Sequence, residues 1–467
     1  MSDEHRYVAE VSLPVSVDQA FAYHDRPGAL DRLIPPWESA RIERSDRSLD
    51  PGSEVELVTK IAGIPVRWVA QHTQYDPPHL FEDVQLSGPF ASWLHRHEFQ
   101  STGEHSSQMR DEIRYRMPMG PVGNALGHAK ARATIESMFA YRHRTTSDDL
   151  KLLAKESADA HNAKPLTVAI SGSNGLVGSR LQTLLSLLGH QTRDIVRGDA
   201  KNIDDVAVWS EGDDYRKLGG VDAVVHLAGK PIADDRWTEE VRREIRDSRV
   251  KKTRELCEKL ARLDHKPRVL VCASATGFYG DRGDEVLSES SCAGEGFLPD
   301  VCQEWEQSCQ AAVDAGIRVV HARFGIVLTP AGGALAKMLT PAKLFGGSLG
   351  SGKQWWSWIA IDDVLGAIHH SIIDPAVQGP VNFVSPTPVT NREFAKTLAD
   401  VLGRAAVFPA PAFGLRLALG EMADALLLAS ARVEPQRLNE TGYEFRFTNL
   451  QDTLRHYLGR HRCASVA

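Results

Sequence analysis

One glycine-rich loop restricts the folds open to this chain. Residues 166–170 (LTVAI) are typical of a buried strand, and Gly172, Gly175 and Gly178 follow at intervals of three residues. From Leu176 onward, leucines recur every three or four residues, which predicts a helix. A glycine triplet alone is often a tight turn, but glycines between a strand and a helix let a diphosphate approach backbone amides. We therefore predict a phosphate-binding loop in a parallel sheet.

Three later apolar segments predict further buried strands. They are residues 221–229 (VDAVVHLAG), 267–280 (PRVLVCASATGFYG) and 317–328 (IRVVHARFGIVL). With the glycine loop they predict an α/β fold, a doubly wound parallel sheet of the Rossmann type that binds NAD(P). The cofactor contacts predicted at the loop and the next strand end are Gly172, Ser173, Asn174, Gly175, Leu176, Val177, Gly178, Leu227, Ala228 and Gly229.

The end of the second predicted strand indicates which dinucleotide binds. The segment 192–197 (TRDIVR) ends at Arg197 and lacks the terminal acidic residue that accepts hydrogen bonds from the adenosine ribose of NAD. A guanidinium group at this position suits a 2′-phosphate, so the sequence favours NADP over NAD. The alternative is an exposed arginine on a loop that takes no part in binding.

The first 147 residues have the pattern of a separate α+β domain. A strand and a short helix (RYVAEVSLPVSVDQAFAYHD) come first, five strands follow, and a long helix starts at about Gly123. This order, and the phrase VSVDQAFAYHDRPGALDRLIPPW, resemble the helix-grip domain of the START/polyketide-cyclase-like (SRPBCC) superfamily. The resemblance implies a curved sheet around the helix and a pocket for an apolar small molecule. A structural or dimerising appendage is the alternative.

Several longer motifs follow the glycine loop in a fixed order. They are HLAG, SATGFYGDRGDEVLSE, FGIVL, GSGKQWWSWIAIDDV and GPVNFVSPTPVTNREFAKTLADVLG, which resemble extended short-chain dehydrogenase/reductase proteins. The ending PAPAFGLRLALGEMADALLLASARVEPQRLNETGYEF narrows the resemblance to the nucleoside-diphosphate-sugar epimerase family with a conserved C-terminal domain. The resemblance covers residues 165–458. It implies a smaller lobe that closes a substrate cleft, and Arg249, Ala273 and Arg323 as further cofactor contacts.

These patterns divide the chain into four segments. We predict a helix-grip domain at residues 1–147, a polar linker at 148–164, a Rossmann domain at 165–378 and a C-terminal lobe at 379–467. A chain of 467 residues is long enough for several separate cores.

The acid/base pair that such reductases and epimerases typically use is absent. That pair is a tyrosine with a lysine four residues later, and none of the nine tyrosines here has such a lysine. At the corresponding place the chain reads GFLPDVCQEWEQSC. The remaining candidates for proton transfer are Tyr279, Ser274, Cys302 and Glu306, with Thr276 beside them. Each has a structural alternative, since tyrosine and cysteine often pack in cores and a helix glutamate is often solvated.

Three tryptophans in the segment KQWWSW are the predicted substrate contacts. Trp355, Trp356 and Trp358 can form an aromatic platform for a nucleotide base or a sugar. A tryptophan cluster also commonly packs the seam between two domains, and that alternative stays open.

Composition excludes several classes of function. A net charge of −7 gives no general attraction for nucleic acid or anionic membranes. The chain shows no secretory signal and no apolar run of about 18 residues, so we expect a cytoplasmic protein without membrane contact. The six cysteines form no C-x-x-C pair and no tight Cys/His cluster of the zinc type. Reduced thiols and no metal site are therefore expected.

Three hypotheses about function follow. The first is an NADP-dependent epimerase-like or reductase-like enzyme that transfers hydride to or from a small-molecule substrate. The second is a non-catalytic NADP(H)-binding sensor or regulator whose N-terminal domain binds an apolar ligand. In the third, the helix-grip domain delivers an apolar ligand to the neighbouring reductase. The sequence leaves the substrate and the oligomeric state open.

Overall fold

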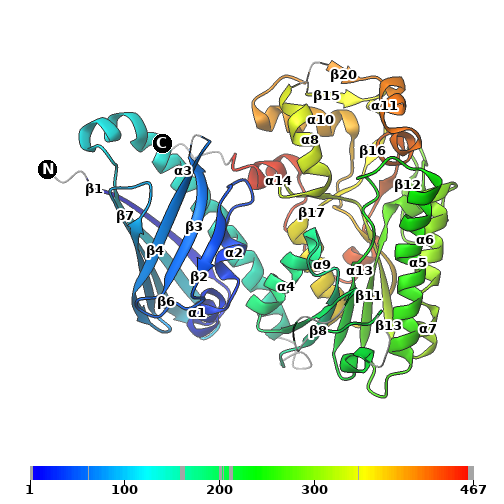
Figure 1. Cartoon of the computed structure of the whole chain (residues 1–467), viewed down its shortest axis with the longest axis horizontal. Coiled ribbons are helices and arrows are strands. Elements are labelled where there is room, and N and C mark those ends of the chain that lie inside the picture. Colours follow the sequence, from blue (N-terminus) through cyan, green and yellow to red (C-terminus); the bar gives the residue numbers. More distant parts are fainter. Residues whose placement is uncertain are drawn as a thin grey trace. The chain divides into compact units, whose positions relative to one another are not determined.

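The structure is a computed structural model that describes residues 4–61, 63–157, 164–198, 202, 205–209, 214–344, 346–406 and 408–460 (Figure 1). The chain divides into two compact units. The first comprises residues 1–164, 183–189 and 456–467, and the second comprises residues 165–182 and 190–455. Within the described ranges, no helix combines the length and the apolar composition that a membrane span requires.

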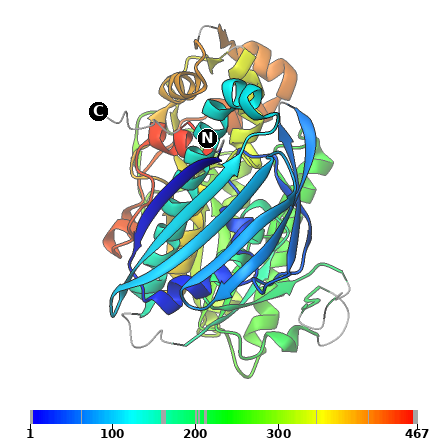
Figure 2. The ribbon, with the colours of Figure 1, turned by 90° about the vertical axis from the view of Figure 1, so that its left-hand side faces the viewer.

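The first unit is built on one antiparallel sheet of seven strands, in the order β1-β7-β6-β5-β4-β3-β2 (Figure 2). The strands are β1 (Glu4–Leu13), β2 (Arg41–Ser45), β3 (Glu54–Ile61), β4 (Ile64–Asp76), β5 (Leu80–Ser87), β6 (Ser92–Gly103) and β7 (Ser106–Arg116). Strands β3 to β7 pair with their sequence neighbours as hairpins, as short turns between alternating segments predict. The segment RIERS of β2 has no apolar alternation, so the sequence does not predict this strand.

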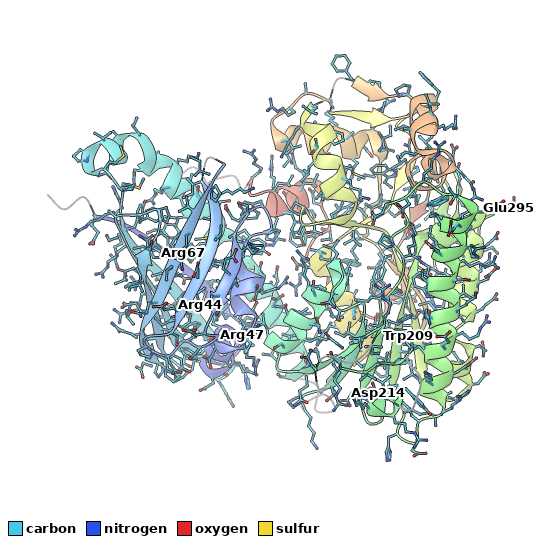
Figure 3. All side chains as sticks on the ribbon, in the orientation of Figure 1. Arg44, Arg47, Arg67, Trp209, Asp214 and Glu295 are labelled. Carbon is cyan, nitrogen blue, oxygen red and sulfur yellow. The ribbon has the colours of Figure 1, made fainter. Side chains whose placement is uncertain are left out.

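Charged pairs join the three strands β2, β3 and β4 at one end of this sheet. Arg44 on β2 pairs with Glu54 on β3 at 2.6 Å. Arg67 on β4 pairs with Glu56, which is also on β3 (Figure 3). These arginines are exposed, so each pair adds little stability. They do keep the edge charged, which discourages pairing with another chain.

Three helices accompany the sheet: α1 (Val17–Asp25), α2 (Ala29–Leu33) and α3 (Gly120–Ser157). Ser16 and Gln19 form a capping box at the start of α1. The helix α3 continues past the predicted start of the linker at residue 148, because Leu150 is fully buried in the same core as Phe21. The antiparallel sheet with its long helix confirms the predicted α+β helix-grip fold.

The second unit contains a parallel sheet of six strands in the order β18-β13-β11-β10-β8-β9. The strands are β8 (Thr167–Ser171), β9 (Gln191–Ile195), β10 (Ala223–His226), β11 (Val269–Ala275), β13 (Arg318–Phe324) and β18 (Gly379–Phe383). On one side of the sheet lie α5 (Glu239–Ala261), α6 (Phe297–Gln307) and α7 (Gln310–Asp314), and on the other lie α4 (Leu176–Leu187) and α9 (Ile361–Ile373) (Figure 1). This confirms the predicted Rossmann sheet.

The strand order reverses beside β8. β8 pairs with β9 on one side and with β10 on the other, so the connections leave it in opposite directions. In doubly wound sheets, ligands bind at the carboxyl ends of the strands at such a point. The glycine loop follows β8, and therefore begins at this point.

A smaller lobe surrounds the ends of β13 and β18. It includes α8 (Gly333–Leu344), α10 (Asn391–Leu402), α11 (Ala412–Leu419), α12 (Glu421–Ala423), α13 (Gln436–Glu440) and α14 (Leu450–Tyr457). Short two-stranded sheets also occur in this second unit. They pair β12 (Val286–Leu287) with β21 (Arg432–Val433), β14 (Ile326–Leu328) with β17 (Trp358–Ala360), β15 (Gly346–Leu349) with β20 (Phe408–Ala410), and β16 (Trp355–Trp356) with β19 (Val389–Thr390). The strand that begins at Gly379 pairs with β13, so it belongs to the Rossmann sheet and not to the lobe.

Candidate active site

The glycine loop between β8 and α4 is packed so closely that larger residues do not fit. Gly172 has a φ of +76°, and a Cβ atom there would lie 3.0 Å from Ala228 N at the end of β10. A Cβ on Gly175 would lie 3.0 Å, and one on Gly178 only 2.2 Å, from Gly172 O. Glycine is therefore required for the turn and for the approach of the helix to the loop.

The outer side of this loop is open to solvent. Asn174 and Gly175 are exposed, and α4 starts directly after them at Leu176. The first N–H groups of a helix have no carbonyl partner one turn earlier, and they attract anions. A glycine-rich loop at a helix N-terminus fits the diphosphate of a dinucleotide. Val177 and Gly178 belong to this first helical turn.

Asp194 in β9 and Arg197 just after this strand have different surroundings. Arg197 lies two residues beyond Ile195, where β9 ends, and it is exposed. Asp194 lies within β9, and its carboxylate accepts hydrogen bonds from Gln182 on α4 and from Ser173 in the loop. The acidic group of this strand therefore holds the loop in place, whereas the arginine is exposed.

Behind the loop, a buried hydrogen-bond network joins β8, β10, α5 and α6. The hydroxyl of Ser171 contacts His226 Nδ1, and the hydroxyl of Thr253 contacts His226 Nε2 at 3.0 Å. Trp305 Nε1 donates to the same Thr253 hydroxyl at 3.0 Å. Burial lowers the pKa of His226 to about 4, so this imidazole is neutral at physiological pH. The network fixes the start of the glycine loop and α6 relative to each other.

Arg249 on α5 is a partly buried cation beside the end of β10. Its guanidinium carbon lies 5.1 Å from the ring centroid of Trp305, and a Cβ on Gly229 would lie 3.3 Å from it. Nη1 donates to Ile245 O at 3.1 Å. In the part of the chain that the structure describes, no carboxylate pairs with this group. Because an arginine keeps its charge when buried, it can bind an anionic group of a ligand.

Three neighbouring strands align polar residues at their carboxyl ends. Ser274 on β11 lies opposite Arg323 on β13, which lies opposite Asn382 on β18. Glu306 reaches this row from α6. Its two oxygens accept from Arg323 Nε at 2.8 Å and Nη2 at 2.7 Å, and Oε1 also accepts from Ser274 Oγ at 2.7 Å. The side chain of Arg323 is 4% exposed, so this is a buried ion pair.

Tyr279 is enclosed at the end of the short 3-10 helix Thr276–Tyr279. Its hydroxyl accepts from Arg323 Nη1 at 2.9 Å and lies 2.7 Å from Asn382 Oδ1 and 3.0 Å from Ser288 O. Burial raises the pKa of this phenol. Tyr279 therefore packs behind the row of polar residues, and its predicted role in proton transfer stays a prediction.

Cys302 precedes Glu306 by four residues, so both side chains project from the same face of α6. A Cβ on Gly277 would lie 4.0 Å from Cys302 Sγ, which places the thiol against the turn after β11. Burial raises its pKa to about 12, so the sulfur is a protonated thiol at physiological pH. Ala273, one of the predicted cofactor contacts, is buried in β11.

The three predicted substrate tryptophans lie in different environments. Trp358 is fully buried, and its Nε1 donates to Thr387 O at 2.9 Å. Trp356 is buried against Phe394. Trp355 is partly exposed, and its Nε1 donates a hydrogen bond to Asp284 Oδ1. The guanidinium carbon of Arg432 lies 4.4 Å from the centroid of its ring. Only Trp355 presents part of its ring to solvent, and substrate contact stays a prediction for all three.

The sequence does not identify Asn382 or Thr253 as members of the site. Asn382 enters through the register of β18 with β13, and Thr253 through the packing of α5 on β10. Trp305 lies next to Glu306 in the segment GFLPDVCQEWEQSC, which stands where the acid/base pair is expected.

Three protein families match parts of the chain. Residues 13–139 match the polyketide cyclase/dehydrase and lipid transport family, and residues 168–382 match the NAD dependent epimerase/dehydratase family. Residues 410–457 match a domain of unknown function, DUF1731. These matches follow one another in the order that the sequence predicts.

Named relatives cover the second part of the chain. An epimerase family protein of Mycobacterium bovis is 38% identical over 290 residues, which are 62% of this chain and 96% of that protein. The epimerase family protein YfhF of Bacillus subtilis is 35% identical over 296 residues, 62% of this chain and 97% of its own length.

Two solved structures are similar to the chain. The nucleoside-diphosphate sugar epimerase from Corynebacterium glutamicum is 32% identical with a TM-score of 0.79, and the match covers 98% of this chain and 91% of that one. The human epimerase family protein SDR39U1 (isoform 2), solved with NADPH, is 30% identical with a TM-score of 0.58. That match covers 63% of this chain and 99% of the human chain.

Proposed function

Because the chain belongs to the epimerase family, with a Rossmann domain of the NAD(P)-binding type, we propose that it is an NADP(H)-dependent epimerase-like or reductase-like enzyme. It acts on a small molecule by hydride transfer. The single observation that supports this most is the glycine loop at the reversal of strand order, where Gly172 and Gly178 allow no side chain. The absence of a Tyr-x-x-x-Lys pair assigns proton transfer to other residues.

The preference for NADP rests on the end of β9. Arg197 is exposed there and free to meet a 2′-phosphate, while Asp194 is engaged with Gln182 and Ser173. The human relative was solved with NADPH, which is consistent with this preference. The residues that would hold the cofactor are the loop 172–178, Arg197, Leu227, Ala228, Gly229, Arg249, Ala273 and Arg323. When bound, the nicotinamide supplies or accepts a hydride at C4.

Ser274 and Glu306 are the pair that we assign to proton transfer. Ser274 Oγ donates to Glu306 Oε1 and keeps lone pairs that can accept a hydrogen bond from a substrate hydroxyl. As hydride leaves the carbinol carbon, the hydroxyl proton passes to Ser274 Oγ while Ser274 passes its own proton to Glu306. Reduction of a carbonyl reverses both transfers. Because both oxygens of Glu306 already accept hydrogen bonds from Arg323, we expect slow turnover.

Cys302 and Arg249 complete the proposed site. The raised pKa of Cys302 keeps its thiol neutral, so it lines the site as a small group and does not act as a nucleophile. Arg249 has no carboxylate partner among the described residues and can bind an anionic group of the substrate or of the cofactor.

A second candidate is a non-catalytic NADP(H) sensor with an apolar-ligand-binding N-terminal domain. It is favoured by the state of the acid/base groups, since Tyr279 is enclosed and both oxygens of Glu306 are engaged by Arg323. In this case the dinucleotide binds and no chemistry follows. The apolar cluster of the helix-grip unit, which includes Phe21, Phe81 and Phe99, would meet the second ligand.

One experiment separates the two candidates. The purified chain is titrated with NADPH and NADH by calorimetry and then incubated with C4-deuterated NADPH and a panel of carbonyl compounds. Transfer of deuterium to a product supports the enzyme, and its loss in Ser274→Ala with unchanged NADPH affinity supports the assigned proton path. Binding without deuterium transfer across the panel supports the sensor. No binding of either dinucleotide would overturn both.

A further inference from the structure

The inward face of the seven-stranded sheet carries a band of ionisable side chains across its core. Along β6 the inward residues are Trp93, His95, His97 and Phe99, and the outer two belong to separate apolar clusters. The two imidazoles between them lie where an ordinary core would continue with apolar residues. Burial of ionisable groups costs free energy unless they are paired or bind an ion.

Two carboxylates on the neighbouring strands face these histidines. Asp83 on β5 lies opposite His95, and Asp111 on β7 lies opposite His97. His95 Nδ1 is 3.4 Å from Asp83 Oδ2, and His95 Nε2 is 3.2 Å from Asp111 Oδ1. Asp111 is fully buried, and its Oδ2 contacts His143 Nε2 on α3 at 2.5 Å. Three strands and the long helix therefore supply this band.

Three of these residues have the spacing of a metal-ligand set. One ligand atom from each of Asp83, His95 and His97 lies within 4.8 Å of the other two. In a tetrahedral site with bonds of about 2.1 Å, ligand atoms lie roughly 3.4 Å apart, so small side-chain shifts suffice. His97 Nδ1 lies 2.5 Å from Asp111 Oδ1, but the two groups are not oriented for a hydrogen bond. Among the described residues, this buried nitrogen has no other partner.

Other groups beside the band have partners outside it. The guanidinium of Arg142 on α3 donates to Leu33 O at 3.2 Å and lies over the ring of Phe139. Nδ1 of His24 contacts Ala20 O.

We propose that Asp83, His95 and His97 bind a divalent first-row transition-metal ion inside the helix-grip unit. His95 binds through Nδ1 and keeps its Nε2–H on Asp111, an arrangement in which a buried carboxylate orients a metal-bound imidazole. Two imidazoles and a carboxylate suit Zn²⁺, Fe²⁺ or Co²⁺, whereas Ca²⁺ and Mg²⁺ prefer oxygen ligands. Three protein ligands leave a coordination position for water or a small-molecule donor.

The sequence alone leads to the expectation of no metal site, and the proposed site differs from that expectation. Its ligands do not include cysteine, and Asp83 is separated from the two histidines by a hairpin. The H-x-H pattern of residues 95–97 places both imidazoles on one face of a strand, but the same pattern occurs in ordinary strands. Only the register of β5 with β6 brings the carboxylate opposite them.

The test uses the full chain after removal of metals with EDTA. We expect calorimetry to show one tightly bound Zn²⁺ per chain, and Co²⁺ to give the visible absorption of a site with nitrogen and oxygen ligands. X-ray absorption of the Zn²⁺-loaded protein should show scattering from two imidazole rings. This measurement needs no variant, so it decides the proposal even where a substitution impairs folding.

Variants connect the ion to the named ligands. His97→Ala and Asp83→Asn should each weaken Zn²⁺ binding by at least about 100-fold, and Asp111→Asn by about 10- to 100-fold. His105→Ala is the matched control, because this histidine is 86% exposed in the turn between β6 and β7, and its loss should not change the affinity. Circular dichroism establishes that each variant is folded. Zn²⁺ binding that is absent, or equally strong in His97→Ala and Asp83→Asn, would overturn the proposal.

Discussion

Arg323 and Glu306 form a buried, two-bond ion pair between β13 and α6, at 2.8 and 2.7 Å. Glu306 follows Cys302 by four residues, which is the spacing between tyrosine and lysine in the acid/base pair that this chain lacks. The position that holds a cation in that pair therefore holds an anion here, and a cation reaches it from the neighbouring strand. Ser274 hydrogen-bonds to the same carboxylate, so the ion pair sets the charge around the proposed proton path.

Removal of Glu306 should destabilise the protein strongly. In Glu306→Ala, Arg323 keeps its charge in a buried position without a counterion, which typically costs about 3–5 kcal/mol. Chemical denaturation measures the change. Glu304→Ala is the control, because Glu304 lies on the same helix and pairs with an arginine that is 54% exposed, so its loss should cost less than about 1 kcal/mol. Equal effects of the two substitutions would contradict the buried ion pair.

A methyl group on the glycine loop should impair dinucleotide binding. In Gly178→Ala, the new Cβ would lie 2.2 Å from Gly172 O, so the loop and α4 must move apart. We expect NADPH affinity to fall by more than about 10-fold, since a shift of about 1 Å misaligns the amides that face the phosphates. Calorimetry measures this. Gly198→Ala serves as the control because no described residue lies within 4 Å of its Cβ, and it should bind NADPH as the wild type does.

Local patterns in the sequence suffice for most of the fold. The period-two segments of the first unit and the apolar runs around the glycine loop each specify their element without help from distant residues. The limits of elements are harder to predict. The helix α3 continues to Ser157 because Leu150 finds a place in the core, and β2 forms because β3 offers it an edge. Both depend on tertiary contacts that no local pattern contains.

The candidate site is less predictable than the fold for the same reason. Glycine positions follow from the backbone, so the loop can be identified residue by residue. Side-chain partners follow from strand register and helix packing. The meeting of Ser274, Arg323 and Glu306 depends on the alignment of β11 with β13 and on the angle of α6. None of these relationships leaves a signal in sequence spacing.

Arg197 provides a test of cofactor preference. In Arg197→Ala, the charge available to a 2′-phosphate is lost, so NADPH affinity should fall by about 10- to 100-fold while NADH affinity stays unchanged. Competition calorimetry with both dinucleotides measures the ratio. Arg193→Ala is the control, because Arg193 lies on the same strand, β9, and its guanidinium already donates to Lys217 O. A parallel loss of NADPH and NADH affinity would indicate a damaged loop and would contradict the assignment.

Cys302 should resist alkylation until strongly alkaline pH. Burial raises its pKa from 9.0 to about 12, so at a given pH its thiolate fraction is about 1,000-fold lower than that of an unshifted thiol. Below pH 9 the thiol is neutral in both the folded and the unfolded chain. Above pH 9 the thiol of the unfolded chain ionises first. The contribution of Cys302 to the free energy of unfolding therefore decreases between pH 9 and about 12. Mass spectrometry after iodoacetamide treatment at pH 8 should find the exposed Cys292 modified and Cys302 intact. Rapid modification of Cys302 in the folded protein at that pH would show an accessible thiolate, and would return Cys302 to the candidates for proton transfer.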